Sequence, residues 1–209
     1  MPRMYHSPRR ADAAVATRSA ILSAARSLFL AQGFAGTTVP QIARAARVAV
    51  PTVYASTGGK ADILAALLDE VLDDPAVAEA VTSIDTATDA AEVVRVVAEG
   101  ARLNHEHHWD TAAELFPQAE FEPTAAASYE RVLGAYRGVL DRAAARLAAL
   151  DALPPGTNEQ DASDILWFFL GPEAWLALCK DRGWPLRRAA GWLTEGALAA
   201  LVDSGGRQT

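Results

Sequence analysis

The residues best suited to chemistry form a short polar run, His105-Glu106-His107-His108, followed by Trp109. Because His105 and His108 are three positions apart, a helix would place both imidazoles on one face, where they could bind a single metal ion. The run lacks the zinc-protease motif, since Trp109 stands where that motif has its second histidine. It also lacks the di-iron motif, in which a histidine follows a glutamate by three positions. We therefore interpret the run as polar residues at a helix end beside a buried tryptophan, and we predict no metal and no cofactor.

Other reactive groups are few. Gly58-Gly59-Lys60 lacks the spacing of a phosphate-binding P-loop. Cys179 is the single cysteine, so the chain can form no internal disulfide and no cysteine-based structural zinc site. An enzyme built on a helical bundle would need a convergent pair of titratable groups, and we find none beyond the histidine run. We expect a protein that is not an enzyme, and we keep a helical-bundle enzyme as an alternative.

Charge is distributed unevenly along the chain, whose net charge is −7. Residues 1–60 contain eight basic residues against Asp12 alone, and so carry +7, whereas the remainder, with 11 basic and 25 acidic residues, carries −14. The eight basic residues are Arg3, Arg9, Arg10, Arg18, Arg26, Arg44, Arg47 and Lys60. A basic segment joined to an acidic remainder predicts a polyanion, such as double-stranded DNA, as the partner of the basic segment.

The positions of apolar residues predict an all-α protein. They recur at helical spacing through most of the chain, and alternating β-branched runs do not occur. In the first part we expect helices over residues 12–32, 39–46, 51–57 and 60–74. In the rest we expect helices over 75–83, 87–109, 111–119, 124–150, 161–182 and 186–203. Pro172 should kink or break the helix over 161–182.

Three predicted helices in the first 60 residues have the layout of a helix-turn-helix. Gly33 is a suitable stop for the first helix. Thr38 and Gln41 have the spacing of a capping box at the start of the second helix, where Pro40 is tolerated in the first turn. A tight turn at Ala46-Arg47-Val48 joins the second helix to the third. The side chains expected to hold these helices together are Leu28, Phe29, Ile42, Val48 and Val53.

A set of residues in this segment is collinear with a known family, without gaps. The set is Arg18-Ser-Ala-Ile-Leu-Ser-Ala-Ala-Arg-Ser-Leu-Phe29, Gly33-Phe34, Thr37-Thr38-Val39, Ile42-Ala43, Ala46, Val48, Thr52-Val53-Tyr54 and Lys60. It resembles the DNA-binding domain of the TetR (tetracycline-repressor-like) family over about residues 15–70. The resemblance implies that the third helix enters the major groove and that Tyr54 and Lys60 contact the DNA backbone. Our predicted DNA-binding residues are Thr38, Gln41, Arg47, Val50, Pro51, Thr52, Tyr54, Ala55 and Lys60.

The segment departs from the family pattern at four positions. Arg47 replaces a turn glycine, so a side chain must adopt a positive φ at a cost of about 1 kcal/mol. Ala49 replaces a serine that would cap the third helix. Thr57 replaces a phenylalanine, which removes a core anchor between the third and fourth helices. Gly59 replaces a serine and leaves an exposed amide end suited to phosphate.

The larger part of the chain is expected to form a helical bundle rich in aromatic residues. The resemblance implies that this part binds a small molecule and pairs with a second copy through its last two long helices. Bundle pockets are lined by aromatic side chains. We therefore place a largely apolar ligand among His105, Trp109, Phe116, Tyr129, Tyr136, Trp167 and Phe168. The predicted dimer interface, from apolar residues in excess of one chain's core, is Leu170, Trp175, Leu178, Trp192, Leu193 and Leu201.

Two domains are therefore expected: a basic arm, helix-turn-helix and connecting helix over 1–74, and a regulatory and dimerisation domain over 75–209. The expected function is a homodimeric transcription repressor that leaves a pseudo-palindromic operator when its ligand binds. A constitutive DNA-binding protein without a ligand is a further alternative. The apolar runs, such as 165–170, are too short to span a bilayer, and we find no signal peptide, so we expect a cytoplasmic protein with no membrane partner.

Overall fold

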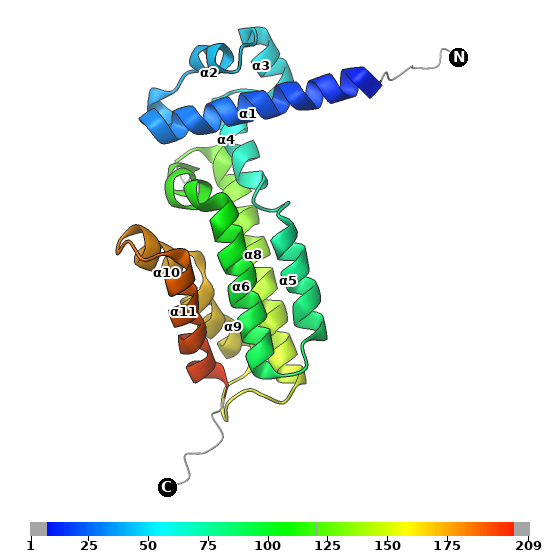
Figure 1. The fold of residues 1–209 in the computed structure, drawn as a ribbon, viewed down its shortest axis with the longest axis vertical. Coiled ribbons are helices and arrows are strands. Elements are labelled where there is room, and N and C mark those ends of the chain that lie inside the picture. The colour runs from blue at the N-terminus through cyan, green and yellow to red at the C-terminus, as the bar shows by residue number, and fades with distance from the viewer. Residues whose placement is uncertain (1–7, 120, 203–209) are drawn as a thin grey trace, which may run out of the picture. The chain divides into compact units, whose positions relative to one another are not determined.

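The computed structural model describes residues 8–119 and 121–202, and every regular element in these ranges is a helix (Figure 1). The predicted all-α class is confirmed. Arg3 and the rest of the predicted basic arm before residue 8 lie outside the described residues. The same holds for the side chains of Arg9 and Arg10, and for Asp203 at the end of the last predicted helix.

The chain divides into two compact units. Unit 1 consists of Met1–Glu70 and Glu114–Glu130, and unit 2 consists of Val71–Ala113 and Arg131–Thr209. The first unit thus combines the N-terminal helices with a segment from the middle of the sequence. The sequence-based division into domains at residue 74 remains a proposal.

Unit 1 is built around its first helix, which packs against the next three. Its helices are α1 (Pro8–Gly36), α2 (Val39–Ala45), α3 (Val50–Thr57), α4 (Lys60–Asp69) and α7 (Phe116–Ala119). The α1 helix begins four residues earlier than predicted, and Gly33, with φ of 76°, interrupts it at the predicted place. Of the five side chains predicted to hold the helix-turn-helix together, Ile42 and Val53 are fully buried and Phe29 is nearly so. Leu28 and Val48 are half-buried.

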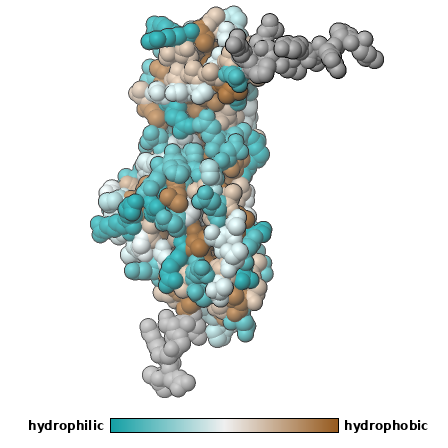
Figure 2. Space-filling view, turned by 45° about the vertical axis from the view of Figure 1, so that its right-hand side comes forward, coloured by the Kyte–Doolittle hydropathy of each residue, from teal (hydrophilic) through white to brown (hydrophobic). Residues whose placement is uncertain are grey.

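Unit 2 is a bundle in which α5 packs along α6, and α11 packs against α6 and α9 (Figure 1). Its helices are α5 (Pro75–Thr86), α6 (Ala90–Asp110), α9 (Glu159–Leu170), α10 (Pro172–Trp175), η2 (Leu176–Lys180, π-helical) and α11 (Leu186–Leu201). Two elements begin in one unit and end in the other, η1 (Thr111–Leu115, π-helical) and α8 (Pro123–Ala149). On the face in Figure 2, hydrophilic and apolar side chains are interspersed.

Prolines lie at the start of two helices in unit 2, α5 and α10. The predicted helix over 60–74 ends at Asp69, and residues 70–73 form a turn. Pro75 disfavours a helical conformation at Asp74 and starts the next helix, α5. Asp74 caps that helix by accepting from the Ala76 backbone N–H at 2.8 Å. Pro172 breaks the predicted helix over 161–182 into α9 and α10, as expected.

Two stretches are long and apolar enough to cross a membrane by length and composition alone, Ala11–Gly36 and Glu159–Lys180. This differs from the expectation drawn from short apolar runs, because alanine-rich helices dilute their few charges over many residues. Both stretches take part in the packing of their own unit: α1 buries Ile21 and Phe29, and α9 and α10 bury Leu166 and Trp175. Their apolar faces therefore serve the two helical cores.

Candidate functional site

A capping box fixes the start of α2, as the sequence predicts. The Thr38 backbone N–H donates to the Gln41 side-chain oxygen at 2.8 Å, and the Gln41 backbone N–H donates to the Thr38 hydroxyl oxygen at 3.4 Å. The Thr38 hydroxyl also donates to the Gln41 side-chain oxygen, at 2.9 Å. Because the cap occupies that oxygen, a base contact from Gln41 would have to come from its NH2 group.

The turn between α2 and α3 is strained at one residue. Arg47 has φ of 57°, the left-handed conformation in which the family pattern has glycine. The Val48 backbone N–H donates to the Ala43 carbonyl at 2.9 Å and closes the turn around it. A side chain in this conformation costs about 1 kcal/mol. The Arg47 side chain is exposed, so burial does not offset this cost.

The α3 helix buries one face and presents the other to solvent. Val53 is fully buried, and Thr57 is 8% exposed, with its hydroxyl donating to the Val53 carbonyl at 3.0 Å. Thr57 thus occupies the core position with its polar group satisfied. Pro51, Tyr54 and Ala55 are exposed on the opposite face, with Tyr54 at 56%. This face is available to a partner without any rearrangement of the helix.

The remaining predicted residues of α3 are half-buried, and α1 holds the far end of the helix. Val50 and Thr52 lie at the side of the exposed face, and Thr52 lines a groove between α1 and α3. The Arg18 guanidinium of α1 donates to the Ser56 carbonyl at 2.9 Å. A cation at a helix C-terminus satisfies a free carbonyl and opposes the negative end of the helix dipole.

Lys60 is engaged within unit 1. Its ammonium donates to the Phe34 carbonyl at 2.7 Å and lies 4.2 Å from the centre of the Phe34 ring. The expectation of an exposed amide end at Gly59 needs correction, because the Gly59 N–H donates to the Asp62 carboxylate at 2.7 Å. A carboxylate already occupies this helix start, so it is poorly suited to phosphate. A DNA contact by Lys60 would have to compete with the Phe34 carbonyl.

Gln118 is a contact that the sequence analysis missed. Its side-chain oxygen accepts from the Phe34 backbone N–H at 2.7 Å. Phe34 follows the Gly33 interruption, where the chain turns from α1 towards α2, so its amide and carbonyl lack helical partners. Gln118 supplies a partner for the amide, and the carbonyl accepts from the Lys60 ammonium and, at 3.2 Å, from the Thr37 backbone N–H. Phe34 and Gln118 are 84 positions apart, and no local sequence pattern indicates a contact between them.

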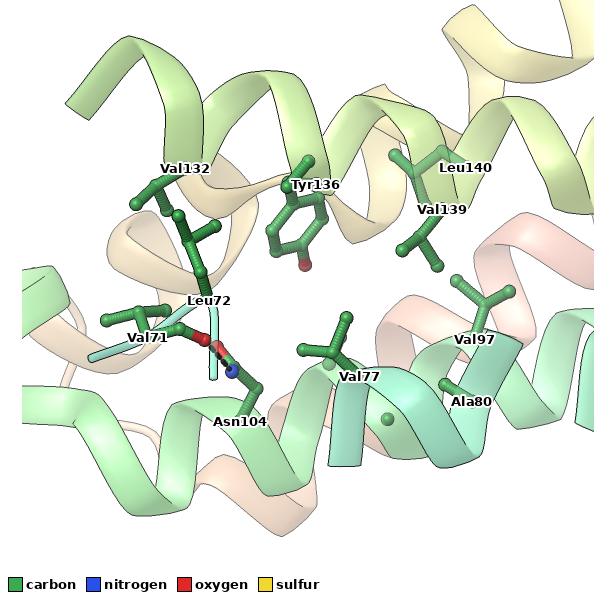
Figure 3. A pocket seen from close by; sticks show the side chains of 13 residues that line it. Val71, Leu72, Val77, Ala80, Val97, Asn104, Val132, Tyr136, Val139 and Leu140 are labelled. Atoms are coloured by element: carbon green, nitrogen blue, oxygen red, sulfur yellow. Dashed lines mark hydrogen bonds between the residues drawn. The ribbon is translucent and has the colours of Figure 1, made fainter. Parts of the chain in front are cut away.

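A cavity of about 70 Å³ lies in unit 2, between α5, α6 and α8 (Figure 3). Its polar side chains are Asn104, which donates to the Val71 carbonyl at 3.4 Å, and Tyr136. The other lining residues are small or apolar: Val71, Leu72, Val77, Ala80, Val97, Gly100, Ala101, Val132, Ala135, Val139 and Leu140. Binding sites for drug-sized ligands usually measure about 300–1,000 Å³. A ligand of that size would therefore have to move these helices apart.

Of the predicted ligand residues, Tyr136 lines this cavity. Three other predicted ligand residues are linked to Tyr136 through contacts between aromatic rings. Its ring centre is 6.5 Å from that of His105 and 6.1 Å from that of Trp167. Trp109 in turn lies 6.1 Å from His105. These four rings form a continuous aromatic cluster within unit 2.

The other predicted ligand residues lie elsewhere. Phe116 and Tyr129 belong to unit 1, where their rings pack on each other with centres 5.1 Å apart. Phe168 is 73% exposed on α9. These residues share the aromatic type of the others, but helix packing places them in different surroundings.

The histidine run divides into two environments. His107 Nδ1 and His108 Nε2 each lie 2.8 Å from one oxygen of Asp74. Burial raises the pKa of Asp74, but hydrogen bonds from the Ala76 amide and both imidazoles outweigh it and hold the pKa below its ordinary value. His105, by contrast, is 3% exposed and packs against aromatic rings. Within residues 8–119 and 121–202, no group of three or more His, Cys, Asp or Glu residues is placed to hold a metal ion.

The residues predicted for the dimer interface are mostly core residues of unit 2. Leu170, Trp175 and Leu201 are fully buried, and Leu193 is 2% exposed. These side chains fill the chain's own core and leave no surface for a second copy. Leu178 is partly buried against the same core. Trp192, on α11, is 53% exposed and remains available to a partner.

Comparison with known proteins matches the N-terminal segment to one family. Residues 21–67 match the bacterial regulatory proteins of the tetR family. The HTH-type transcriptional regulator HbdR of Aromatoleum sp. (strain CIB) is 48% identical over 56 residues, which cover 27% of this chain and 24% of HbdR. The matched part thus spans about a quarter of that curated relative.

Solved structures resemble the chain over nearly its whole length. NalD of Pseudomonas aeruginosa, the secondary repressor of the MexAB-OprM multidrug efflux pump, has a TM-score of 0.72 and 25% identity, over 90% of this chain and 96% of NalD. The SmeT–triclosan complex, whose repressor comes from Stenotrophomonas maltophilia, has a TM-score of 0.73 and 22% identity, over 91% of this chain and 93% of SmeT. At 22% identity, the resemblance to SmeT shows a shared fold and no more.

Proposed function

Because the chain belongs to the TetR family of bacterial regulators, we propose that it is a transcription repressor whose ligand releases it from DNA. In this proposal two copies bind a pseudo-palindromic operator in the cytoplasm, and a small, largely apolar molecule binds in unit 2. The proteins that the chain resembles are regulators rather than enzymes.

The exposed face of α3 is the observation that carries the proposal. Val53 and Thr57 anchor the helix, so that Pro51, Tyr54 and Ala55 face outward on a rigid support. This face offers few hydrogen-bonding groups. Base recognition should therefore rely on contacts with thymine methyl groups and on DNA shape.

Arg47 adds the strongest polar contact in this proposal. It is exposed in the turn that precedes α3, and it keeps a strained backbone conformation. A guanidinium in this place would donate to a guanine or to a phosphate. Thr38, Gln41, Val50 and Thr52 would lie around this contact, at the edges of the groove.

The cavity between α5, α6 and α8 supports the ligand part of the proposal. Its lining is apolar apart from Asn104 and Tyr136, which favours an apolar ligand. SmeT has been solved with triclosan bound, and NalD represses a multidrug efflux pump. A ligand larger than the cavity would displace Val71 and Leu72, which lie in the turn that directly follows α4. We propose that α4 passes this displacement on to the helix-turn-helix.

Dimerisation completes the proposed mechanism. One short helix reads too few bases for useful specificity, so two are needed. A two-fold dimer would hold its α3 helices about 34–36 Å apart, or a multiple of one DNA turn. A ligand can release DNA only if it binds better to a dimer with a different spacing. Trp192 on α11 and Phe168 on α9 are exposed and are our candidates for the interface.

Selection of bound sequences from a random DNA library tests the proposal. The full chain should enrich a pseudo-palindrome, and fluorescence anisotropy should then show that Tyr54→Ala and Arg47→Ala each weaken binding about tenfold or more. Phe121→Ala is the matched control, because Phe121 is also an exposed aromatic residue of unit 1 and lies outside α3. If no sequence is enriched, or if all three variants bind like the parent, the proposal is wrong.

A further inference from the structure

His105 is a buried polar side chain without a partner. The residue is 3% exposed, and neither ring nitrogen has a hydrogen-bond partner among the described residues. A neutral imidazole carries one donor and one acceptor, and leaving such groups buried and unpaired is unfavourable for folding. Groups of this kind in a native structure call for an explanation, such as a missing ligand or water.

The rings around His105 are held in place by a backbone carbonyl. Trp175 lies closest, with ring centres 4.9 Å apart, and Tyr136 lies at 6.5 Å. Both donate to the Leu170 carbonyl, Trp175 through its indole N–H at 3.0 Å and Tyr136 through its hydroxyl. In a continuous helix the Leu170 carbonyl would accept from the Ala174 backbone N–H. Because Pro172 ends α9, the Ala174 N–H donates to the Gly171 carbonyl instead, and the Leu170 carbonyl is left for the two side chains. Trp175 and Tyr136 therefore have their polar atoms satisfied, and cannot turn them to the imidazole without breaking these bonds.

His105 does not line the cavity, but its position on α6 places it next to residues that do. It follows Ala101, a lining residue, by four positions, so it lies on the same face of α6 one turn further on. Asn104, its neighbour in sequence, lines the cavity as well. Tyr136 lines the cavity (Figure 3). Its ring centre also lies 6.5 Å from that of His105. A ligand that enlarges the cavity past Tyr136 would reach the imidazole.

We propose that His105 is the polar recognition residue for the ligand, and that the ligand is an uncharged, mostly apolar molecule with a hydroxyl group. This rests on the proposed ligand-binding function of unit 2. Burial lowers the pKa of His105 to about 4, so the imidazole is neutral at pH 7. Its ring contacts are aromatic, and they offer no charge to balance a buried carboxylate or ammonium group. A hydroxyl can donate to the free ring nitrogen or accept from the ring N–H.

A matched pair of probes tests this assignment. The compounds 4-ethylphenol and 4-ethyltoluene have nearly the same shape and differ in one hydroxyl. Their affinities for the full-length protein are measured by isothermal titration calorimetry at pH 7. The parent protein should prefer the phenol by about tenfold, and His105→Leu and His105→Phe should bind both probes equally. Two replacements are used so that one poorly packed variant cannot decide the result.

The control is His107→Leu, which removes a histidine that does not line the cavity and should keep the preference. Thermal unfolding separates recognition from structure: both His105 variants should unfold at the same temperature as the parent or higher, because an unpaired polar group has been removed. Equal affinity of the parent for both probes, binding of neither probe, or a preference that survives in both His105 variants would overturn the inference. Operator binding without any probe is scored separately, so that a failure of this inference is distinguishable from a failure of the proposed repressor function.

Discussion

The helix-turn-helix of unit 1 and the cavity of unit 2 differ in how completely their polar groups are satisfied. In unit 1 the Phe34 amide and carbonyl, the Gly59 amide and the Thr57 hydroxyl all have partners at 2.7–3.0 Å. In unit 2 both nitrogens of the buried His105 have none among the described residues. The polar groups beneath the proposed DNA-binding surface are therefore satisfied within the chain, whereas the proposed ligand site holds a buried polar side chain without a partner in the described part of the chain.

The two regions also differ in where they keep unfavourable free energy. In unit 1 the unfavourable feature is the backbone of Arg47, whose positive φ lies on the surface where a partner would bind. In unit 2 the unfavourable feature is the His105 side chain, which is buried near the cavity without a hydrogen-bond partner from residues 8–119 and 121–202. In both cases the unfavourable feature lies at the proposed binding site, and the following predictions test that correspondence.

The largest expected effect concerns the pH dependence of stability. Unfolded His105 takes up a proton near its ordinary pKa of 6.5, whereas burial lowers the folded pKa to about 4. Between these values the unfolded state binds more protons, so the free energy of unfolding should fall as the pH falls, by about 3 kcal/mol across the whole window. Urea denaturation of the parent and of His105→Leu at pH 7, 6 and 5 measures this. An identical pH slope in both proteins would show that His105 is not buried as described.

A smaller effect is expected at the proposed dimer interface. Trp192→Arg places a charge on an exposed aromatic position of α11 and should raise the dimer dissociation constant about 30-fold, which corresponds to roughly 2 kcal/mol. Phe121→Arg is the matched control, because Phe121 is 81% exposed but lies outside the proposed interface. Sedimentation equilibrium gives both constants. If the two variants dissociate alike, α11 is not the interface.

The smallest effect on stability is expected at Arg47, with opposite signs in two measurements. Arg47→Gly removes the strain and should raise the free energy of unfolding by about 1 kcal/mol, while the lost guanidinium should weaken operator binding about tenfold. Arg47→Ala keeps the strain and loses the same contact, so it should weaken binding without the gain in stability. Chemical denaturation and anisotropy provide the two values. Unchanged operator binding in both variants would remove Arg47 from the DNA contacts.

The helix-turn-helix could be predicted from sequence because its signals are local. Thr38 and Gln41 are three positions apart and form the expected capping box, and Gly33 interrupts α1 by its own backbone conformation. Pro172 likewise ends α9 whatever packs against it. The residues exposed on α3 follow from helix periodicity once Val53 is recognised as core.

The cavity and the interface could not be predicted in this way, because they depend on contacts between distant helices. Leu170 and Trp175 have the composition of an interface, but they are buried in the chain's own core. Phe116 and Tyr136 look alike in sequence, yet they lie in different units. The cavity is lined mainly by valine and alanine from three helices, residue types that carry no signal of their own.

The number of chains bound to one operator tests the central claim most directly. Light scattering of the protein with a selected pseudo-palindromic duplex gives the mass of the complex. The account predicts two chains per duplex, and a free protein with about twice the mass of the 22.1 kDa chain. A free protein that is monomeric, and that binds the duplex as one chain with full affinity, would contradict both the dimer and the release mechanism built on the spacing of its α3 helices.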